Sequence, residues 1–117
     1  PLFMLERTLK EARMIRVTVS YRNEPDKKFD WDYFTGPHLE LLHRELDHRG
    51  MVRVEFDKGI SAADPSAPAP FIASAHLIFN TVEDVHTAFI AAGRPVMGDV
   101  PNYTDISPTL QISEMIG

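Results

Sequence analysis

The stretch FIASAHLIFNTVEDVHTAFIAAG (residues 71–93) decides the fold of this 117-residue chain, because it joins a strand directly to a helix. Its first nine residues alternate between two faces: Phe71, Ala73, Ala75, Leu77 and Phe79 on one, and Ile72, Ser74, His76 and Ile78 on the other. A period of two predicts a strand, here with both faces partly covered. Thr81 and Asp84 form a capping pair that starts a helix, which we expect Gly93 to end and Pro95 to keep from resuming.

Toward the N-terminus, two further segments alternate in the same way. Residues 14–22 place Ile15, Val17, Val19 and Tyr21 on one side, and residues 52–57 alternate until Gly59, so both predict strands. Between them, Asp30 can cap a helix that runs to about Arg49. Gly36-Pro37 interrupts that helix, since proline removes a backbone donor, and we expect a short first turn, a kink and a main helix from Pro37.

Toward the C-terminus, residues 94–104 are irregular and 105–114 read as a last strand. Pro108 can donate no ladder hydrogen bond, so this strand should lie at an edge or carry a bulge. The order βαββαβ predicts a ferredoxin-like α+β domain, with a four-stranded antiparallel sheet and two helices on one face. We assign residues 1–13 to an N-terminal extension and 14–117 to the domain. The free sheet face is partly apolar, so we expect a partner's sheet to close it around a cavity.

Composition excludes several classes of protein. A net charge of −5 with scattered basic residues argues against a nucleic-acid partner. The chain has no cysteine, which excludes disulfides, thiolate metal sites and cysteine nucleophiles. No apolar run reaches the roughly 20 residues that span a bilayer, and the N-terminus has no signal-peptide pattern. These features predict a cytoplasmic protein without a membrane partner.

Three segments together resemble a known family: FDWDYFTGPHLELL (29–42), APAPFIASAHLIFNTVEDVHTAF (67–89) and MGDVPNYTDISPTLQISE (97–114). They are similar, in order, to the EthD family, named for ethyl tert-butyl ether degradation and part of the dimeric α/β-barrel superfamily. The resemblance implies a ferredoxin-like subunit and a homodimeric barrel, in agreement with the pattern of strands and helices.

The same resemblance implies that the protein binds, and transforms, a small, largely apolar organic molecule in an oxidative catabolic pathway, with oxidoreductase activity. Two alternatives stay open: a non-catalytic binding or accessory subunit of an oxygenase system, and a cofactor-free decarboxylase, isomerase or cyclase. Fold alone does not choose among them. We expect no cofactor, although superfamily relatives include haem proteins and one axial histidine to haem is compatible with the sequence.

The candidate catalytic residues are His38, His76 and Tyr33. On the first helix, His38 shares a face with Phe34, Leu41 and Leu42, and a histidine there suits proton transfer in a dry cavity. The alternative is a buried histidine bonded only to a backbone carbonyl. The candidate ligand-binding residues are Phe34, Ser74, Ile78, Asp99, Tyr103 and Asp105, where the two aspartates could instead make turn hydrogen bonds.

No metal site is predicted. The histidines of the first helix, His38, His43 and His48, step by five residues, which places neighbours about 140° apart around a helix and prevents them from converging on one ion. The sequence also lacks HExxH, GxGxxG and P-loop motifs.

Overall fold

The computed structural model describes residues 13–117, so the predicted extension at 1–13 lies almost entirely outside the described residues. The elements follow in the order β1 (Ile15–Arg22), α2 (Trp31–Tyr33), a π-helical turn (Phe34–His38), α3 (Leu39–Leu46), a 3₁₀ turn (Asp47–Arg49), β2 (Met51–Lys58), β3 (Phe71–Phe79), α4 (Val82–Gly98), a 3₁₀ turn (Val100–Asn102) and β4 (Thr109–Glu114). Within these residues no helix combines the length and apolarity needed to cross a bilayer.

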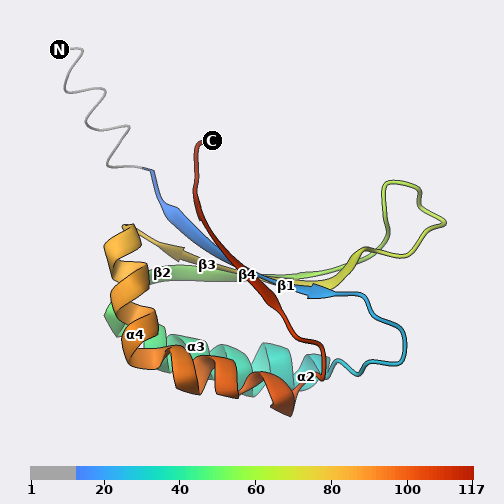
Figure 1. The fold of residues 1–117 in the computed structure, drawn as a ribbon, viewed down its shortest axis with the longest axis horizontal. Helices are drawn as coiled ribbons and strands as arrows, with labels where there is room; N and C mark the ends of the chain where they lie inside the picture. Colours follow the sequence, from blue (N-terminus) through green and yellow to red (C-terminus); the bar gives the residue numbers. More distant parts are fainter. Residues whose placement is uncertain (1–12) are drawn as a thin grey trace.

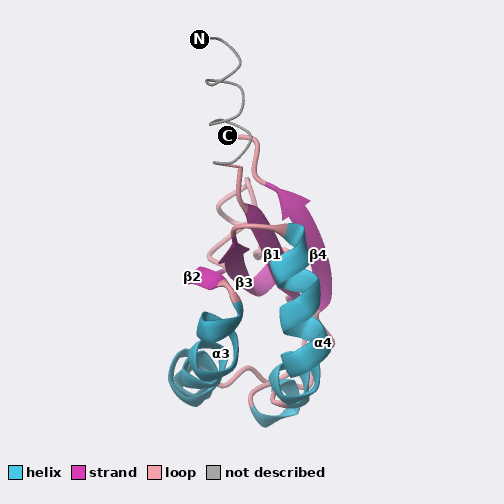
Figure 2. Ribbon diagram, turned by 90° about the vertical axis from the view of Figure 1, so that its left-hand side faces the viewer, coloured by secondary structure: helices cyan, strands magenta, loops and turns pink. Residues whose placement is uncertain are grey.

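The sheet confirms the predicted ferredoxin-like architecture. Its four strands lie in the order β2-β3-β1-β4, and every neighbouring pair is antiparallel. Both long helices cover the same face, which leaves the other face open (Figures 1 and 2). The last strand lies at an edge as predicted, and Pro108 comes just before it, where no ladder bond is lost.

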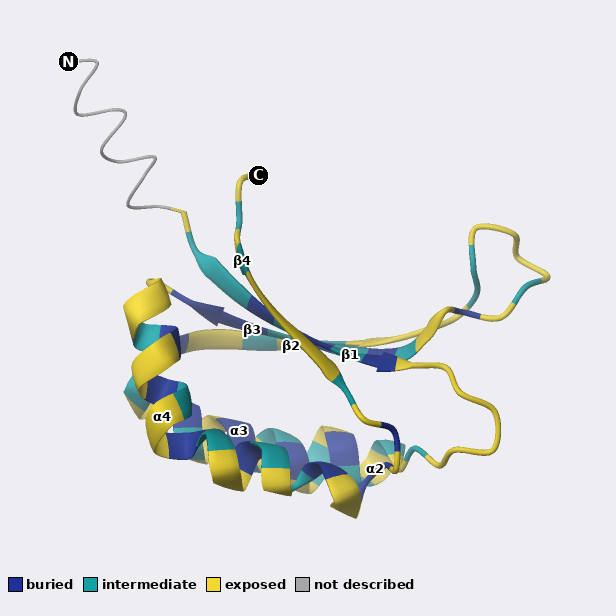
Figure 3. Cartoon of the chain, in the orientation of Figure 1, coloured by how far each residue is buried: buried dark blue, intermediate teal, exposed yellow. Residues whose placement is uncertain are grey.

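The core lies between the sheet and the helices, where dark-blue buried residues gather in Figure 3. The alternation in β1 and β3 directs one set of side chains to this side, and the helices contribute residues at steps of three and four. The buried core residues from these elements include Val17, Val19, Tyr21, Ala73, Ala75, Leu77, Phe79, Phe34, Leu42, Leu46, Val85, Ala88, Ala92 and Val96.

The first helix is continuous where we expected a kink. Asp30 caps it as predicted, with its Oδ1 accepting from the Tyr33 N–H at 3.1 Å. At Gly36-Pro37 the chain widens into the π-helical turn, which accommodates the missing N–H of Pro37 without ending the helix. The buried residues Phe34, His38 and Leu42 consequently succeed one another at steps of four and face the sheet.

The predicted end of the second helix is wrong. The Thr81 cap is present, with Asp84 N–H donating to its Oγ1 at 3.0 Å, but α4 continues through Gly93 and Pro95 to Gly98. Ala92 and Val96 extend its buried face, and their burial outweighs the local cost of glycine and proline. Pro95 has no N–H, so the carbonyl one turn earlier in the helix has no helical donor. Because Pro95 is exposed, that carbonyl lies on the side of the helix that is open to water. The longer helix ends at Asp99 and so positions that residue.

Candidate functional site

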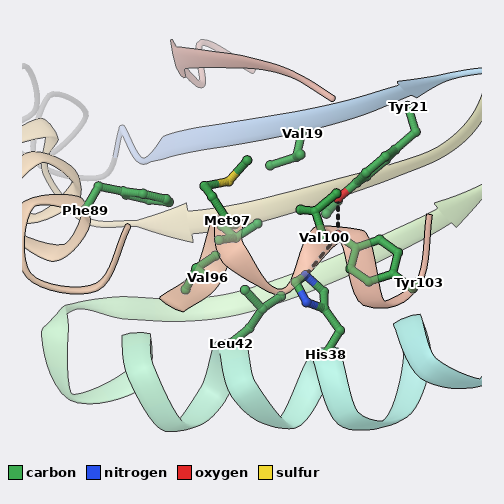
Figure 4. Close-up of a pocket in the computed structure, with 11 residues that line it drawn as sticks. Val19, Tyr21, His38, Leu42, Phe89, Val96, Met97, Val100 and Tyr103 are labelled. Carbon is green, nitrogen blue, oxygen red and sulfur yellow. Dashed lines mark hydrogen bonds between the residues drawn. The ribbon is translucent and has the colours of Figure 1, made fainter. Parts of the chain in front are cut away.

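A small cavity lies between the helix-covered face of the sheet and the two long helices (Figure 4). Its volume is about 10 Å³, roughly the room that one water molecule needs. Most of its wall is apolar, including Val19, Leu42 and Met97, and three polar side chains meet at one end: His38, Tyr21 and Tyr103. This is the arrangement expected of a site that orients a ligand through a few convergent polar groups.

His38, at the end of the π-helical turn, is held from both sides and only 3% exposed. Its Nδ1 lies 2.9 Å from Asp99 Oδ2, and its Nε2 lies 3.3 Å from the Tyr103 hydroxyl. An ionised carboxylate only accepts, so Nδ1 carries the proton and donates it to Asp99. Nε2 of the neutral ring then has a free lone pair, directed at Tyr103 and the cavity.

Asp99 uses both carboxylate oxygens. Oδ2 accepts from His38, while Oδ1 accepts from the Tyr33 hydroxyl at 2.7 Å and from Asn102 Nδ2 at 2.8 Å. Burial raises the pKa of Asp99, but the hydrogen bonds from Tyr33, Asn102 and His38 outweigh it and hold the pKa below its usual value. Asp99 is therefore ionised at neutral pH and fixes the tautomer of His38.

Burial has the opposite consequence for the histidine. It lowers the pKa of His38, and the hydrogen bond and charge of Asp99 offset only part of that effect. The ring is therefore neutral at pH 7, in the form that can take a proton at Nε2.

Two tyrosines extend the network behind the histidine. The Tyr103 and Tyr21 hydroxyls lie 2.5 Å apart, and because Tyr103 donates to His38 it accepts from Tyr21. Burial raises the pKa of Tyr103 far above its usual value and that of Tyr21 to about 12. Both hydroxyls keep their protons at neutral pH, so the donor order runs from Tyr21 through Tyr103 and His38 to Asp99.

An aromatic cluster excludes water from this end of the site. The ring of Phe34 stacks with His38, with centroids 5.8 Å apart and planes 14° apart. Phe34 also stacks with Phe56, at a distance of 4.1 Å between ring centroids, and contacts Tyr103 at a centroid distance of 5.2 Å. Hydrogen bonds in such a dry environment are electrostatically stronger than in water.

The structure thus brings together five of the predicted site residues: His38, Tyr33, Phe34, Asp99 and Tyr103. Asp105 is elsewhere, accepting a hydrogen bond from the Lys28 N–H at 3.0 Å in a surface loop. That contact joins two segments distant in the sequence, so Asp105 neither lies in the network around His38 nor makes the predicted local turn bond here.

The remaining three predicted residues, His76, Ser74 and Ile78, lie on the opposite face of the sheet from His38. His76 Nε2 pairs with Asp57 Oδ2 at 2.7 Å, and Ser74 is the cross-strand neighbour of the same aspartate. Ile78 has no exposed surface. The third strand reaches the His38 cavity through its other face, with Ala75 and Leu77.

Sequence reasoning missed two members of the network, Tyr21 and Asn102. The signal for Tyr21 was available: it ends the apolar face of the first strand, and a buried tyrosine hydroxyl needs a partner. Asn102 sits one turn after Asp99, but nothing in its local pattern separates it from an ordinary turn residue.

No family model and no curated protein sequence matches this chain, but solved structures do. An EthD-like protein from Ralstonia eutropha is 31% identical, with a TM-score of 0.83 over 90% of this chain and 94% of that one. An ethyl tert-butyl ether degradation (EthD) family protein from Bacillus halodurans is 17% identical, with a TM-score of 0.61 over 87% and 98%. The hydroxynitrile lyase from Passiflora edulis shares the fold at 10% identity and a TM-score of 0.62, over 87% and 93%.

Proposed function

This chain belongs to the EthD family, and from that premise we propose that its His38 site binds a small, largely apolar organic molecule and transfers a proton to or from it. One observation carries the proposal. Asp99 holds the buried, neutral His38 by Nδ1, which directs the basic Nε2 into an apolar cavity. A histidine that is neutral at pH 7 and fixed in position in a dry site is the arrangement that general base catalysis needs.

The proton transfer uses three side chains. The contact between His38 Nε2 and the Tyr103 hydroxyl is 3.3 Å, long for an O–H donor, so a ligand oxygen can replace it at low cost. Nε2 takes a proton from a weakly acidic O–H or C–H group of the ligand, and Asp99 stabilises the imidazolium that forms. The Tyr103 hydroxyl donates to the oxygen that becomes negative, with Tyr21 donating to Tyr103 behind it.

The enolate or phenolate produced is a shared intermediate for several reactions. We propose that the reaction at this site is the proton transfer alone, which prepares the ligand for oxidation elsewhere in a catabolic pathway, and the same base would serve a decarboxylation, isomerisation or cyclisation. The hydroxynitrile lyase of Passiflora edulis supports catalysis on this fold in general terms. The cavity beside His38 is far too small for haem, so we propose chemistry by the protein's own groups. A cysteine-free chain suits the reducing cytoplasm.

A second candidate is a non-catalytic binding or accessory subunit, and the small volume of the cavity favours it. A protein that holds a ligand without turning it over needs no room for a second reactant. The two candidates share the ligand site and differ only in whether a proton leaves the ligand.

The test uses two small probes. Phenol, which has a weakly acidic O–H, should bind the wild-type protein and bind His38→Gln about tenfold more weakly, since the hydrogen bond from its O–H to Nε2 in a dry site is lost. His76→Gln, on the open face, is the matched control and should bind normally. Equal binding of phenol to wild type and His38→Gln would contradict the proposal.

Exchange of deuterium from D₂O into the acidic C–H of phenylacetone then separates the candidates. Exchange that depends on His38 indicates catalysis. Binding of phenylacetone without exchange indicates the accessory role.

We also propose that the protein is a homodimer joined through the open face of the sheet. On this face β3 places apolar Ile72 and Ile78 beside polar Ser74 and His76. A face of this mixed kind can be closed by the sheet of a second subunit. A dimeric ferredoxin-like protein from an uncultured marine organism has the same fold, at 7% identity and a TM-score of 0.50. Light scattering at micromolar concentration should give twice the subunit mass, and a monomer would contradict the proposal.

A further inference from the structure

The cavity at His38 is too small for the ligand that the proposed function requires, but a larger space lies next to it. A groove of about 270 Å³ runs between α4 and β4, lined by Val17, Val85, His86, Phe89, Leu110 and Ile112. Phe89 lines both the groove and the cavity. Together the two spaces approach the size of ordinary small-molecule pockets, about 300 Å³ and above.

The strands show that the two spaces are neighbours on the same face of the sheet. Val17 lines the groove and Val19 lines the cavity, and the two point to the same side of β1. On β4, their cross-strand neighbours are Ile112 and Leu110, which both line the groove. The ring of Phe89 stands at the end of the cavity away from His38 and points into it (Figure 4). One side chain therefore separates the open groove from the catalytic end.

We propose that the groove between α4 and β4 is the apolar subsite of the His38 site, and that Phe89 is the gate between them. This inference rests on the proposed function of His38. Rotation of the Phe89 side chain joins the spaces, so a ligand enters by the groove, places its oxygen at His38 and leaves its apolar part between the helix and the edge strand. Phe89 is only partly buried, and its side chain has open space to move into on the groove side.

The lining defines the chemistry of the ligand. Leu110 and Ile112 are 41% and 46% exposed, although they lie on the helix-covered side of the sheet. Among the described residues, His86 is the only polar side chain that lines the groove, so residues 13–117 offer no other acidic or basic side chain there to pair with a charge. The ligand is thus an uncharged molecule with one weakly acidic oxygen at one end and an alkyl or aryl extension at the other.

A series of para-alkylphenols, from phenol to 4-butylphenol, measures the subsite directly by calorimetry. Each added CH₂ buried in the groove should tighten binding about fourfold, from roughly 0.8 kcal/mol per CH₂. Ile112→Asp should remove this dependence on chain length, because a carboxylate then lies where the alkyl chain would be buried. Ile90→Asp is the matched control, because Ile90 is on α4 beside Phe89 but is 88% exposed and lines neither space.

If Phe89 is a gate, its replacement by a smaller residue has the opposite effect on affinity from the replacement of a residue that contacts the ligand. Phe89→Ala should tighten phenol binding by about tenfold. In the wild-type protein only the minor population with Phe89 turned away can bind, whereas in the variant the path is always open. Phe89→Trp, which keeps the core filled, should weaken it. This second variant keeps the proposal testable if the alanine variant folds poorly.

The outcomes separate the inference from the proposed function. Phenol binding that depends on His38 but shows no dependence on chain length overturns the subsite and leaves the proposed function standing. Loss of the dimer in Ile112→Asp, seen by light scattering, with unchanged alkylphenol affinities would assign the groove to a second copy of the chain and also overturn the subsite. Phenol binding that is equal in the wild-type protein and in His38→Gln contradicts the proposed function itself.

Discussion

Two histidine–aspartate pairs lie on opposite faces of the same sheet, and they differ chiefly in their access to water. The His38–Asp99 contact is 2.9 Å long with side chains 4% and 11% exposed, while the His76–Asp57 contact is 2.7 Å long with side chains 21% and 65% exposed. The shorter contact is the less protected one. Distance alone therefore does not identify the functional pair, whereas burial and the further partners of each member do.

The difference arises from the layers of the fold. Both helices pack on one face, so His38 is enclosed by α4, the sheet and the aromatic cluster, and Asp99 receives two further hydrogen bonds. His76 has only β-strand neighbours on its face within the described residues. An exposed pair of this kind typically contributes between 0 and 1 kcal/mol to stability.

The largest expected contrast comes from adjacent residues of β3. Leu77→Ala should destabilise the protein by about 2–5 kcal/mol, since it leaves a cavity in the core. His76→Ala, one residue away on the open face, should cost less than about 1 kcal/mol. Urea denaturation of the two variants measures both values. Similar losses would contradict this contrast and show that His76 contributes as much to stability as a core residue does.

The second contrast compares the two aspartates. Asp99→Asn should lower the rate of phenylacetone exchange by about a hundredfold, because the charge that sets the His38 tautomer and stabilises its cation is gone. Most of the loss should appear in kcat, and the pH profile should shift, as befits a positioning residue. Asp57→Asn should leave the exchange unchanged. An equal effect of both variants would mean that the two faces cooperate in one site.

A third contrast lies within the buried network. Tyr103→Phe removes the hydroxyl that accepts from Tyr21 and donates to His38, so two buried groups lose a partner and the free energy of unfolding should fall by about 1–3 kcal/mol. Tyr33→Phe should cost less, because the Tyr33 hydroxyl lies at the more accessible end and Asp99 keeps the bond from Asn102. Chemical denaturation compares them. A larger loss of stability in Tyr33→Phe than in Tyr103→Phe would mean that the hydrogen bonds to Asp99 contribute more to stability than those of Tyr103.

The fold was predictable because alternation and capping act locally. The period of two in β1 and β3 assigns every residue to a face, which already separates His76 from Leu77. The end of α4 was not predictable from local rules. Gly93 and Pro95 are breakers by propensity, and only the tertiary burial of Ala92 and Val96 carries the helix on to Asp99.

Five of the nine residues predicted for the site lie together in the structure, but the hydrogen bonds that connect them could not be predicted. His38, Tyr33 and Asp99 each looked suitable from type and position, but the hydrogen bonds join residues more than 60 positions apart in the sequence. The face on which the cavity forms depends on where the helices pack. The expected cavity between two sheets is therefore a proposal about the dimer, while the cavity that the subunit contains lies under its helices.

The smallest expected effect concerns pH, and it tests whether burial or the aspartate controls His38. Burial lowers the pKa of His38 below its ordinary value of 6.5, so between that value and the lowered one the unfolded chain holds more protons than the folded protein. Stability should consequently fall as the pH drops from about 6.5. The pKa of Asp99 is also lowered, so its own contribution is lost only at still lower pH.

A melting series from pH 7 to 5 should therefore show a decline of a few degrees that is smaller in His38→Gln, because glutamine does not titrate. Ring signals of His38 in an NMR titration give the pKa directly and should place it below 6.5. A value above 6.5 would mean that attraction to Asp99 exceeds the cost of burial. If the value also exceeded the pH of the cell, His38 would be mainly a cation there, able to donate a proton to a ligand but not to accept one.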